Sequence, residues 1–265
     1  MSKIYFKQPI LFFLLCLVVQ SVFSQQTGRM ETDRPDQTEA VYITKTKYLQ
    51  FESGFNVEKN NKLTSLIHPT ILTKYGVCKK FEFRLITELV SEEAYSINSP
   101  TKKYITGLLP VQIGGKIALF EGKGILPQTS FIAHVGISKF ASKAFQTTKI
   151  FPSFRFTMQN SLTENIALGY NLGAEWDGES NTPDWIYTFA PGFNIGKNWY
   201  GYIELYGAVR KSAAPQHSIA SGFAYYISDN TKIDFSGSYG LSEDATDWYT
   251  AIGFSFRLPV SKKGN

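Results

Sequence analysis

The sequence predicts an all-β protein, a transmembrane antiparallel up-and-down β-barrel of about 12 strands that follows a cleaved signal peptide. Three observations predict this class. The chain opens with an apolar leader, hydrophobic and polar residues then alternate with a period of two, and short polar turns alternate with mostly longer polar loops. Aromatic residues make up 15% of the chain, and 21 glycines and 15 tyrosines are also typical of β proteins.

Residues 1–24 predict a signal peptide. Two lysines form a basic start, Ile10–Val19 is an unbroken apolar run, and Ser21–Ser24 supplies the small residues that precede a cleavage site. The run is shorter than the roughly 20 residues of a membrane-spanning helix; a retained anchor is the alternative. Cleavage here would leave Cys78 as the sole cysteine, so no disulfide is expected and stability must come from closure and burial.

Residues 25–45 are predicted to form a polar periplasmic segment. The stretch Glu31–Glu39 is dense in charge and does not alternate. One hypothesis is a plug that enters the barrel from its short-turn end, with its aspartates paired to basic side chains inside and Arg34 paired to facing carboxylates. The partners considered for the aspartates are Lys74, Arg84 and Arg155. The alternative is a solvated tail. The candidate plug or periplasmic motif comprises Thr32, Asp33, Arg34, Pro35, Asp36 and Glu39.

Residues 46–258 are predicted to form the barrel, and 259–265 a polar tail. The alternation is clearest in Leu49–Val57, Asn165–Trp176 and Trp248–Leu258. Pro152 and Pro191 fall within strands and cannot donate to the ladder, so local bulges are expected there. No long helix is expected after the leader.

Short turns and longer loops are predicted at opposite ends of the barrel, with both termini on the short-turn side. The short turns are 78–80, 121–124, 163–165, 197–198 and 228–230. The loops are 91–106, 141–147, 177–184, 211–216 and 242–247, with a shorter turn at 58–62. An even number of strands with this asymmetry is typical of bacterial outer-membrane barrels.

A soluble β-sandwich also alternates, so the polar face decides between the two classes. Here that face is mainly small or uncharged, with charges spaced out, which suits a crowded wet interior better than a surface in bulk water. Tryptophans are expected at the strand ends, where their rings favour the headgroup level. The predicted interface aromatics are Trp176, Trp185 and Trp248 at the long-loop rim and Trp199 at the short-turn rim.

Charged residues at inward positions are candidates for lining the lumen. They are Glu52, Lys74, Glu82, Arg84, Lys116, Arg155, Glu175, Glu204, Asp234 and Arg257. Two interpretations stay open. These charges select the solutes that pass, or they pair with one another and fill a closed interior, since an isolated charge is costly in a poorly hydrated space.

The chain resembles the outer-membrane family named after a putative MetA pathway of phenol degradation. The matching stretches are Thr32–Glu39, Gln50–Phe55, Lys74–Val77, Phe81–Leu85, Leu168–Gly173, Glu204–Gly207 and Gly253–Arg257. The resemblance implies a transporter-like or channel-like barrel, with phenolic substrates only a label in the family's name. The chain departs from the common pattern of barrels because nine residues follow Phe256, where many barrels end on an aromatic residue.

The function expected is therefore transport of small solutes, aromatic or hydrophobic ones included, by a porin-like barrel of the bacterial outer membrane. A non-conducting structural or surface-interaction barrel is the alternative. An outer-membrane hydrolase is less favoured. Its site would lie on the lipid-facing surface, whereas His68 and His134 fall on lumen-facing positions and His217 has no suitably placed serine. No catalytic residue, cofactor or metal is predicted. The expected partners are outer-membrane lipid, a small solute and the barrel-assembly machinery; the net charge of +5, without a basic cluster, argues against nucleic acid.

Overall fold

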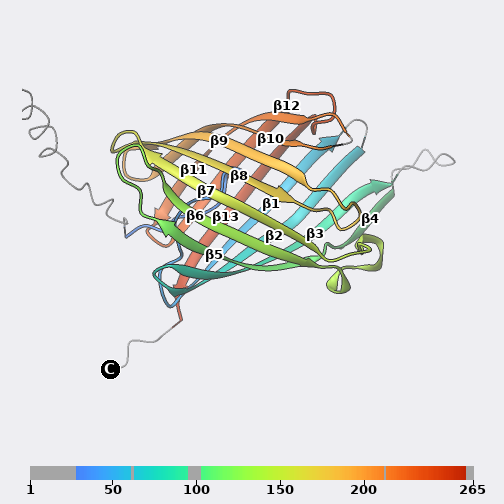
Figure 1. Cartoon of the computed structure of the whole chain (residues 1–265), viewed down its shortest axis with the longest axis horizontal. Coiled ribbons are helices and arrows are strands. Elements are labelled where there is room, and N and C mark those ends of the chain that lie inside the picture. The colour runs from blue at the N-terminus through green and yellow to red at the C-terminus, as the bar shows by residue number, and fades with distance from the viewer. Residues whose placement is uncertain (1–27, 61–62, 95–102, 212, 261–265) are drawn as a thin grey trace, which may run out of the picture.

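A computed structural model describes residues 28–60, 63–94, 103–211 and 213–260 of the chain. They form one closed antiparallel barrel (Figure 1). Its strands are β1 (Tyr48–Asn60), β2 (Leu63–Cys78), β3 (Phe81–Ala94), β4 (Lys103–Leu108), β5 (Val111–Phe120), β6 (Gln128–Ile137), β7 (Phe151–Ser161), β8 (Ile166–Glu175), β9 (Asp184–Ile195), β10 (Trp199–Val209), β11 (Gln216–Ser228), β12 (Thr231–Gly240) and β13 (Trp248–Pro259).

The thirteen strands fill twelve positions in the barrel wall. β3 pairs with β4 along Leu89–Ala94 and with β5 along Phe81–Ile86, so β4 and β5 are two parts of one wall strand. Residues 109–110 separate them, and Pro110 has no N–H to donate to a ladder. Pairing of β1 with β13 and of β2 with β3 closes the wall. The predicted class and the count of about 12 strands are confirmed.

Both ends of the barrel chain lie at one mouth, because Tyr48 pairs with Pro259. The short turns lie at this mouth, at the left in Figure 1, and the longer loops lie at the other. The long-loop side carries two short 3-10 helices, η1 (Ser138–Phe140) and η2 (Lys143–Phe145). Among the described residues, no helix is long and apolar enough to cross a membrane.

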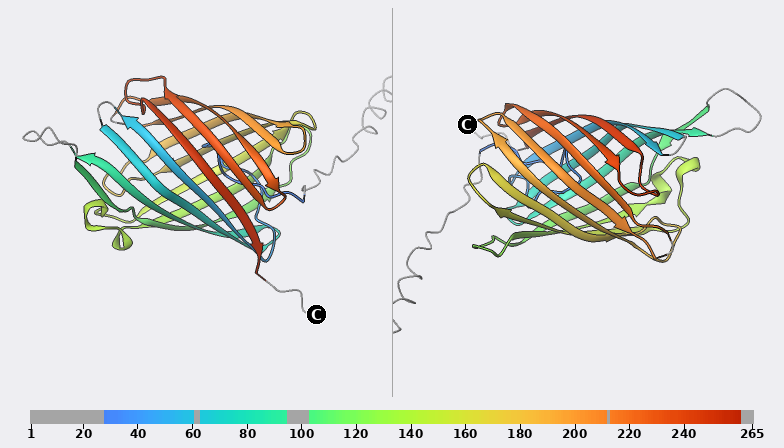
Figure 2. Two further views of the ribbon diagram at one scale, coloured as in Figure 1. Left: turned by 180° about the vertical axis from the view of Figure 1, so that it is seen from behind. Right: turned by 90° about the horizontal axis from the view of Figure 1, so that it is seen from above.

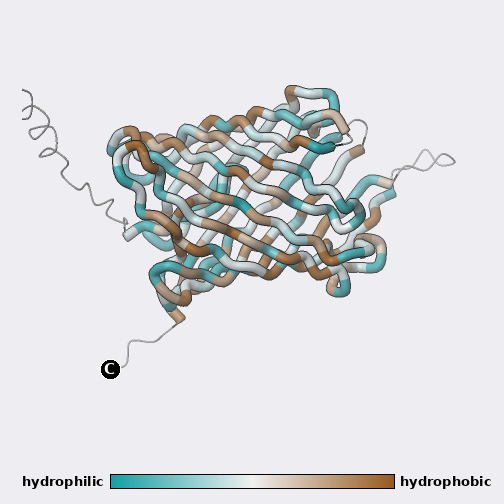
Figure 3. Tube along the Cα trace, viewed as in Figure 1, coloured by the Kyte–Doolittle hydropathy of each residue, from teal (hydrophilic) through white to brown (hydrophobic). Residues whose placement is uncertain are grey.

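The two faces of the wall differ as the alternation predicts (Figure 3). In one cross-strand row, Phe55, Ile252 and Phe235 point outward and are 53%, 59% and 45% exposed. The next inward row contains Gly253 and Asp234 in register. An apolar outer band with a polar inside is the arrangement that lipid requires, and closure leaves no unpaired edge in hydrocarbon.

The structure differs from the sequence-based predictions at three places. The prediction of bulges at Pro152 and Pro191 is wrong. β7–β8 pairing starts at Ser153, so the missing N–H of Pro152 falls at the ladder's end. At Pro191 the β9–β10 ladder skips two pairs without changing register. The predicted loop 91–106 is partly strand, since β3 extends to Ala94 and β4 begins at Lys103. The predicted leader, residues 1–24, and residues 261–265 of the tail lie outside the described residues.

Replacing Ile252 with arginine tests the lipid-facing assignment. This side chain lies mid-strand on the outer face, so the change should lower the free energy of unfolding by about 2–4 kcal/mol. Denaturant titration in lipid vesicles, followed by heat-modifiable gel migration, measures it. Glu243→Arg, in the exposed β12–β13 loop, is the control and should be near neutral. Equal losses in both variants would contradict the membrane placement.

Candidate functional site

Residues 28–47, called the lumen segment from here on, lie inside the short-turn half of the barrel (Figure 2). Both ends of the segment lie at the short-turn mouth. Near one end, the backbone N–H of Met30 donates to the carbonyl of Asp229 in the β11–β12 turn at 2.8 Å. At the other end, Lys47 N–H donates to the carbonyl of Gly76 at 2.7 Å. The segment is therefore an inserted loop rather than a chain threaded through the barrel.

The carboxylate of Asp33 binds three cations from three neighbouring wall strands. Asp33 Oδ2 lies 2.9 Å from Lys74 Nζ and 2.8 Å from a guanidinium nitrogen of Arg84, and Asp33 Oδ1 lies 2.9 Å from Lys116 Nζ. All four side chains are buried. The β2–β3 register places Lys74 directly opposite Arg84, where like charges repel. Asp33 therefore supplies negative charge that this register needs, together with Glu52 at 2.5 Å from Lys74 and Glu82 at 3.1 Å from Arg84.

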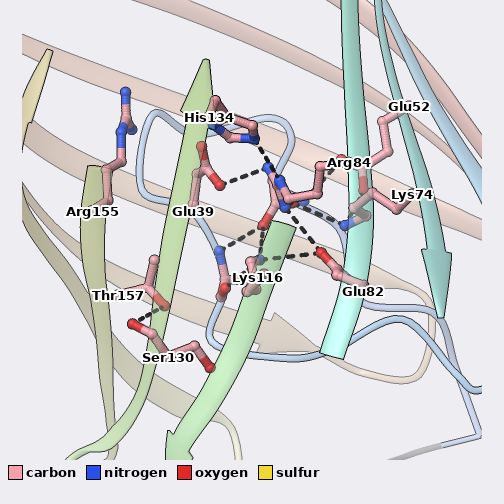
Figure 4. A network of polar contacts seen from close by, with 12 residues as sticks. Glu39, Glu52, Lys74, Glu82, Arg84, Lys116, Ser130, His134, Arg155 and Thr157 are labelled. Atoms are coloured by element: carbon pink, nitrogen blue, oxygen red, sulfur yellow. Dashed lines mark hydrogen bonds and ion pairs between the residues drawn. The ribbon is translucent and has the colours of Figure 1, made fainter. Parts of the chain in front are cut away.

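Arg84 extends the network along the segment (Figure 4). Its second terminal nitrogen lies 2.7 Å from Glu39 of the segment, and its first lies 3.1 Å from Glu82 on the same strand. Its Nε donates to the ring of His134 on β6 at 3.1 Å. Each of the three guanidinium nitrogens of Arg84 therefore has at least one acceptor, which a buried guanidinium requires.

A second set of contacts fixes the backbone beside Asp33. Glu52 of β1 accepts the N–H groups of Asp33 and Arg34 at 2.8 and 3.2 Å. Arg34 pairs with Asp234 of β12 at 2.9 Å. Lys232, also on β12, donates to the hydroxyl of Thr32 and to the carbonyl of Arg34. Charge-assisted bonds of this kind are about twice as strong as neutral ones.

The other side of the lumen holds the segment through uncharged groups and one carboxylate. Glu204 of β10 accepts the N–H of Gln37 at 2.9 Å and the hydroxyl of Thr38 at 2.6 Å. Asn171 of β8 accepts the N–H of Glu39 at 2.7 Å and donates to its carbonyl at 3.2 Å. The segment is thus bonded to most of the wall by polar contacts, and it also buries the apolar side chains of Met30, Val41 and Ile43.

The two aspartates of the segment sit in opposite electrostatic environments. Burial acts to raise the pKa of Asp33, but the charges of Lys116, Lys74 and Arg84 outweigh it and hold that pKa well below its ordinary value. Burial and then the neighbouring Glu204 carboxylate raise the pKa of Asp36 well above its ordinary value. Within the described residues, the Asp36 carboxylate has no ion pair. The native state therefore stabilises the ionised form of Asp33 and disfavours the ionised form of Asp36, each relative to an aspartate in water.

The predicted lumen charges are found on the inner wall, most of them buried. Arg155 and Glu175 pair with each other at 2.6 Å, and Arg155 also donates to the carbonyl of Gln37 at 3.1 Å rather than to an aspartate. Arg257 donates to the carbonyl of Gly28 and to Asn230. The functional role of these residues remains a prediction.

Sequence reasoning gave little weight to several wall groups that bind the segment. They are Gln50, Ser130, Asn171, Thr188, Tyr202 and Lys232. The alternation of the strands predicts that these side chains face the lumen. Most are uncharged, however, and nothing in the strand pattern says which inward hydroxyl or amide meets the segment.

The predicted interface aromatics lie at strand ends. At the long-loop mouth, Trp176 follows β8, Trp185 is the second residue of β9 and Trp248 is the first residue of β13. Trp199 begins β10 at the short-turn mouth. Their role as headgroup anchors stays a prediction.

The histidines are dispersed. His68 bonds Ser91 at 2.8 Å, His134 accepts from Arg84, and His217 bonds the hydroxyl of Tyr187 at 2.7 Å. None of the described residues forms a group of three or more histidine, cysteine or acidic side chains placed to hold a metal.

A closed barrel with a lipid-facing apolar band and a polar lumen defines an outer-membrane β-barrel protein. The chain belongs to the family described as "Putative MetA-pathway of phenol degradation", whose profile matches residues 32–258. The sequence resemblance is thereby confirmed.

Solved structures with a similar fold include the COG4313 outer membrane channel from Pseudomonas putida F1. That structure has a TM-score of 0.68 and 9% identity, and the match covers 86% of this chain and 100% of that one. The P. putida toluene transporter TodX gives a TM-score of 0.45 at 9% identity, covering 81% and 91% of the two chains. At 9% identity the likeness to the COG4313 channel is one of fold. No curated protein sequence matches the chain.

Substitution of the two aspartates by asparagine separates their roles. Asp33→Asn removes the charge shared by three buried cations and should lower the free energy of unfolding by about 3–5 kcal/mol. Asp36 lies three residues further along the segment, and Asp36→Asn removes a charge that the native state disfavours. This substitution should leave the free energy of unfolding at pH 7 unchanged or raise it. The midpoint of heat modification in detergent measures both. Similar midpoints for the two variants would count against the Asp33 cluster as the anchor.

Proposed function

We propose that this protein is an outer-membrane channel for small solutes and that the lumen segment closes it in the conformation described. The observation that carries the proposal is the position of residues 28–47 inside the short-turn half, where they bond to opposite sides of the wall (Figure 2). Lipid outside and a passing solute inside are the partners this arrangement supports. Insertion by the barrel-assembly machinery is part of the proposal, since a closed outer-membrane barrel needs a route into the bilayer.

The character of the contacts supports a gate. Hydrogen bonds and ion pairs hold the lumen segment, and water can replace both when the segment leaves. Because both ends of the segment lie at the short-turn mouth, the loop can withdraw without being unthreaded. Withdrawal would also expose the buried apolar side chains of Met30, Val41 and Ile43, so hydrophobic burial favours the closed state.

The wall also limits the solutes that suit the lumen. Its inner face presents carboxylates, ammonium and guanidinium groups, hydroxyls and amides. An aromatic solute that carries a hydroxyl, as a phenol does, finds hydrogen-bond partners here that a bare hydrocarbon does not. We propose a transport role rather than an enzymatic one, because the dispersed histidines offer no nucleophile–base pair oriented by a third group.

One observation favours a second candidate, a non-conducting structural barrel. The cations around Asp33 are paired so completely that the interior forms a stable closed core. The two candidates differ in one measurable property, the ion current through the barrel.

Planar-bilayer recording distinguishes them. The full barrel should be nearly silent, and a variant lacking residues 28–44 should show stepwise currents because the lumen is then clear. Asp33→Asn is a second release variant and should raise the fraction of open time about tenfold or more, since a loss of 1.4 kcal/mol already shifts an equilibrium tenfold. Asp36→Asn, which breaks no ion pair, is the matched control. Heat-modifiable migration verifies that each variant is folded. Silence of both folded release variants would favour the structural barrel.

A further inference from the structure

The middle of β13 presents small residues to the lumen between the larger inward residues Tyr249 and Arg257, and this strip is called the β13 groove from here on. Its inward residues Ala251, Gly253 and Ser255 are all small. The neighbouring strands stand in register beside them. In the first row, Ala251 lies between Asn56 of β1 and Ser236 of β12. In the second row, Gly253 lies between Gly54 and Asp234. In the third row, Ser255 lies between Glu52 and Lys232. In three successive cross-strand rows of the wall, the central residue, on β13, is therefore a small one.

This part of the wall holds several buried polar atoms without partners. Three of the buried side-chain atoms that lack a hydrogen bond, among the described residues, are Asn56 Oδ1, Asp234 Oδ2 and Ser255 Oγ. Ser255 is 0% exposed. Buried polar atoms are almost always bonded, so a row of unbonded ones indicates a place where water or a polar solute belongs.

The diametrically opposite wall is different. Ser130 of β6 donates to the carbonyl of Val41 of the lumen segment. Thr157 of β7 donates to the carbonyl of Ser130 at 3.4 Å. Neither hydroxyl is left unbonded, and both residues are 0% exposed. The lumen segment is therefore fitted closely to one side of the barrel and leaves unmet hydrogen-bonding capacity on the other.

Arg34 occupies the middle of the groove. A Cβ added at Gly54 or Gly253 would collide with its guanidinium, so these two facing glycines form the notch that holds it. One terminal nitrogen pairs with Asp234 at 2.9 Å, while Arg34 Nε lies unbonded against Gly253. Unbonded groups continue on both sides of the notch, with Asn56 toward the long loops and Ser255 toward the short turns.

We propose that the solute path of this channel runs along the β13 groove and that Arg34 closes it at the Gly54–Gly253 notch. This inference rests on the channel function proposed above. The groove offers carboxylate, amide and hydroxyl oxygens, so it suits small solutes that donate hydrogen bonds. The guanidinium of Arg34 is an internal example of such a ligand, bound where a passing solute would bind.

Two release variants test the gate. Gly253→Ala places a methyl group where the guanidinium lies, and Arg34→Ala removes the guanidinium. Each should raise the mean current about tenfold, because losing one charge-assisted contact shifts the closed–open equilibrium by roughly that factor. The control is Gly201→Ala, whose added Cβ would approach nothing closer than 3.7 Å, and its current should match that of the unaltered barrel. Free guanidinium, on the order of millimolar, should block the Arg34→Ala current by refilling the notch, and Asp234→Asn should abolish that block.

A cysteine placed on each wall locates the path. In a Cys78→Ser, Gly253→Ala background, Ala251→Cys and Thr157→Cys put single thiols on opposite walls, both at buried inward positions. A cationic methanethiosulfonate should suppress most of the current through the Ala251→Cys barrel and little of that through Thr157→Cys.

The outcomes separate the two proposals. Block at Thr157→Cys that equals or exceeds block at Ala251→Cys would place the path elsewhere and overturn the inference. So would silence of folded Gly253→Ala and Arg34→Ala when the variant lacking residues 28–44 conducts. Silence of that deletion variant as well would instead overturn the channel function.

Discussion

The structure depends on one carboxylate, that of Asp33, which binds three buried cations. The β2–β3 register sets Lys74 directly opposite Arg84, and Lys116 comes from β5, while the wall carboxylates Glu52 and Glu82 balance only two of these three cations. Asp33 lies within 2.9 Å of all three. The strand register and the position of the lumen segment are therefore coupled, because Asp33 supplies the negative charge that this part of the wall lacks.

The remaining contacts follow from this anchor. Once Asp33 is fixed, Glu52 can accept the adjacent backbone N–H groups, and Arg34 is carried to the two facing glycines beside Asp234. After Arg34 the segment crosses the lumen, where its backbone donates hydrogen bonds to Glu204 and Asn171. Each cation around Asp33 is bonded, whereas the β12–β13–β1 side keeps several polar atoms without partners. That asymmetry is what a lumen needs if it is to be closed and yet contain a path.

Much of the fold was predictable because lipid imposes simple rules on the chain. A period of two gives a strand with two unlike faces, and turn length separates the two mouths. The errors arose where ladder pairing had to be known. Pro152 lies at the end of a ladder and Pro191 interrupts one without an added residue, so neither produces the expected bulge. The division of one wall strand at residues 109–110 depends on how β3 is shared between two partners.

The sequence by itself determined the barrel, its polarity and which charged residues face inward, since each is a local consequence of alternation and turn chemistry. It also indicated that Asp33 and Arg34 belong to an unusual polar segment. Only the tertiary structure decided which charges meet. Asp33 pairs with Lys74, Arg84 and Lys116 rather than with Arg155. The guanidinium of Arg34 lies against Gly54 and Gly253, which are 199 residues apart in the sequence. Such pairings depend on barrel closure, which brings β1 beside β13, and no local pattern records that distance.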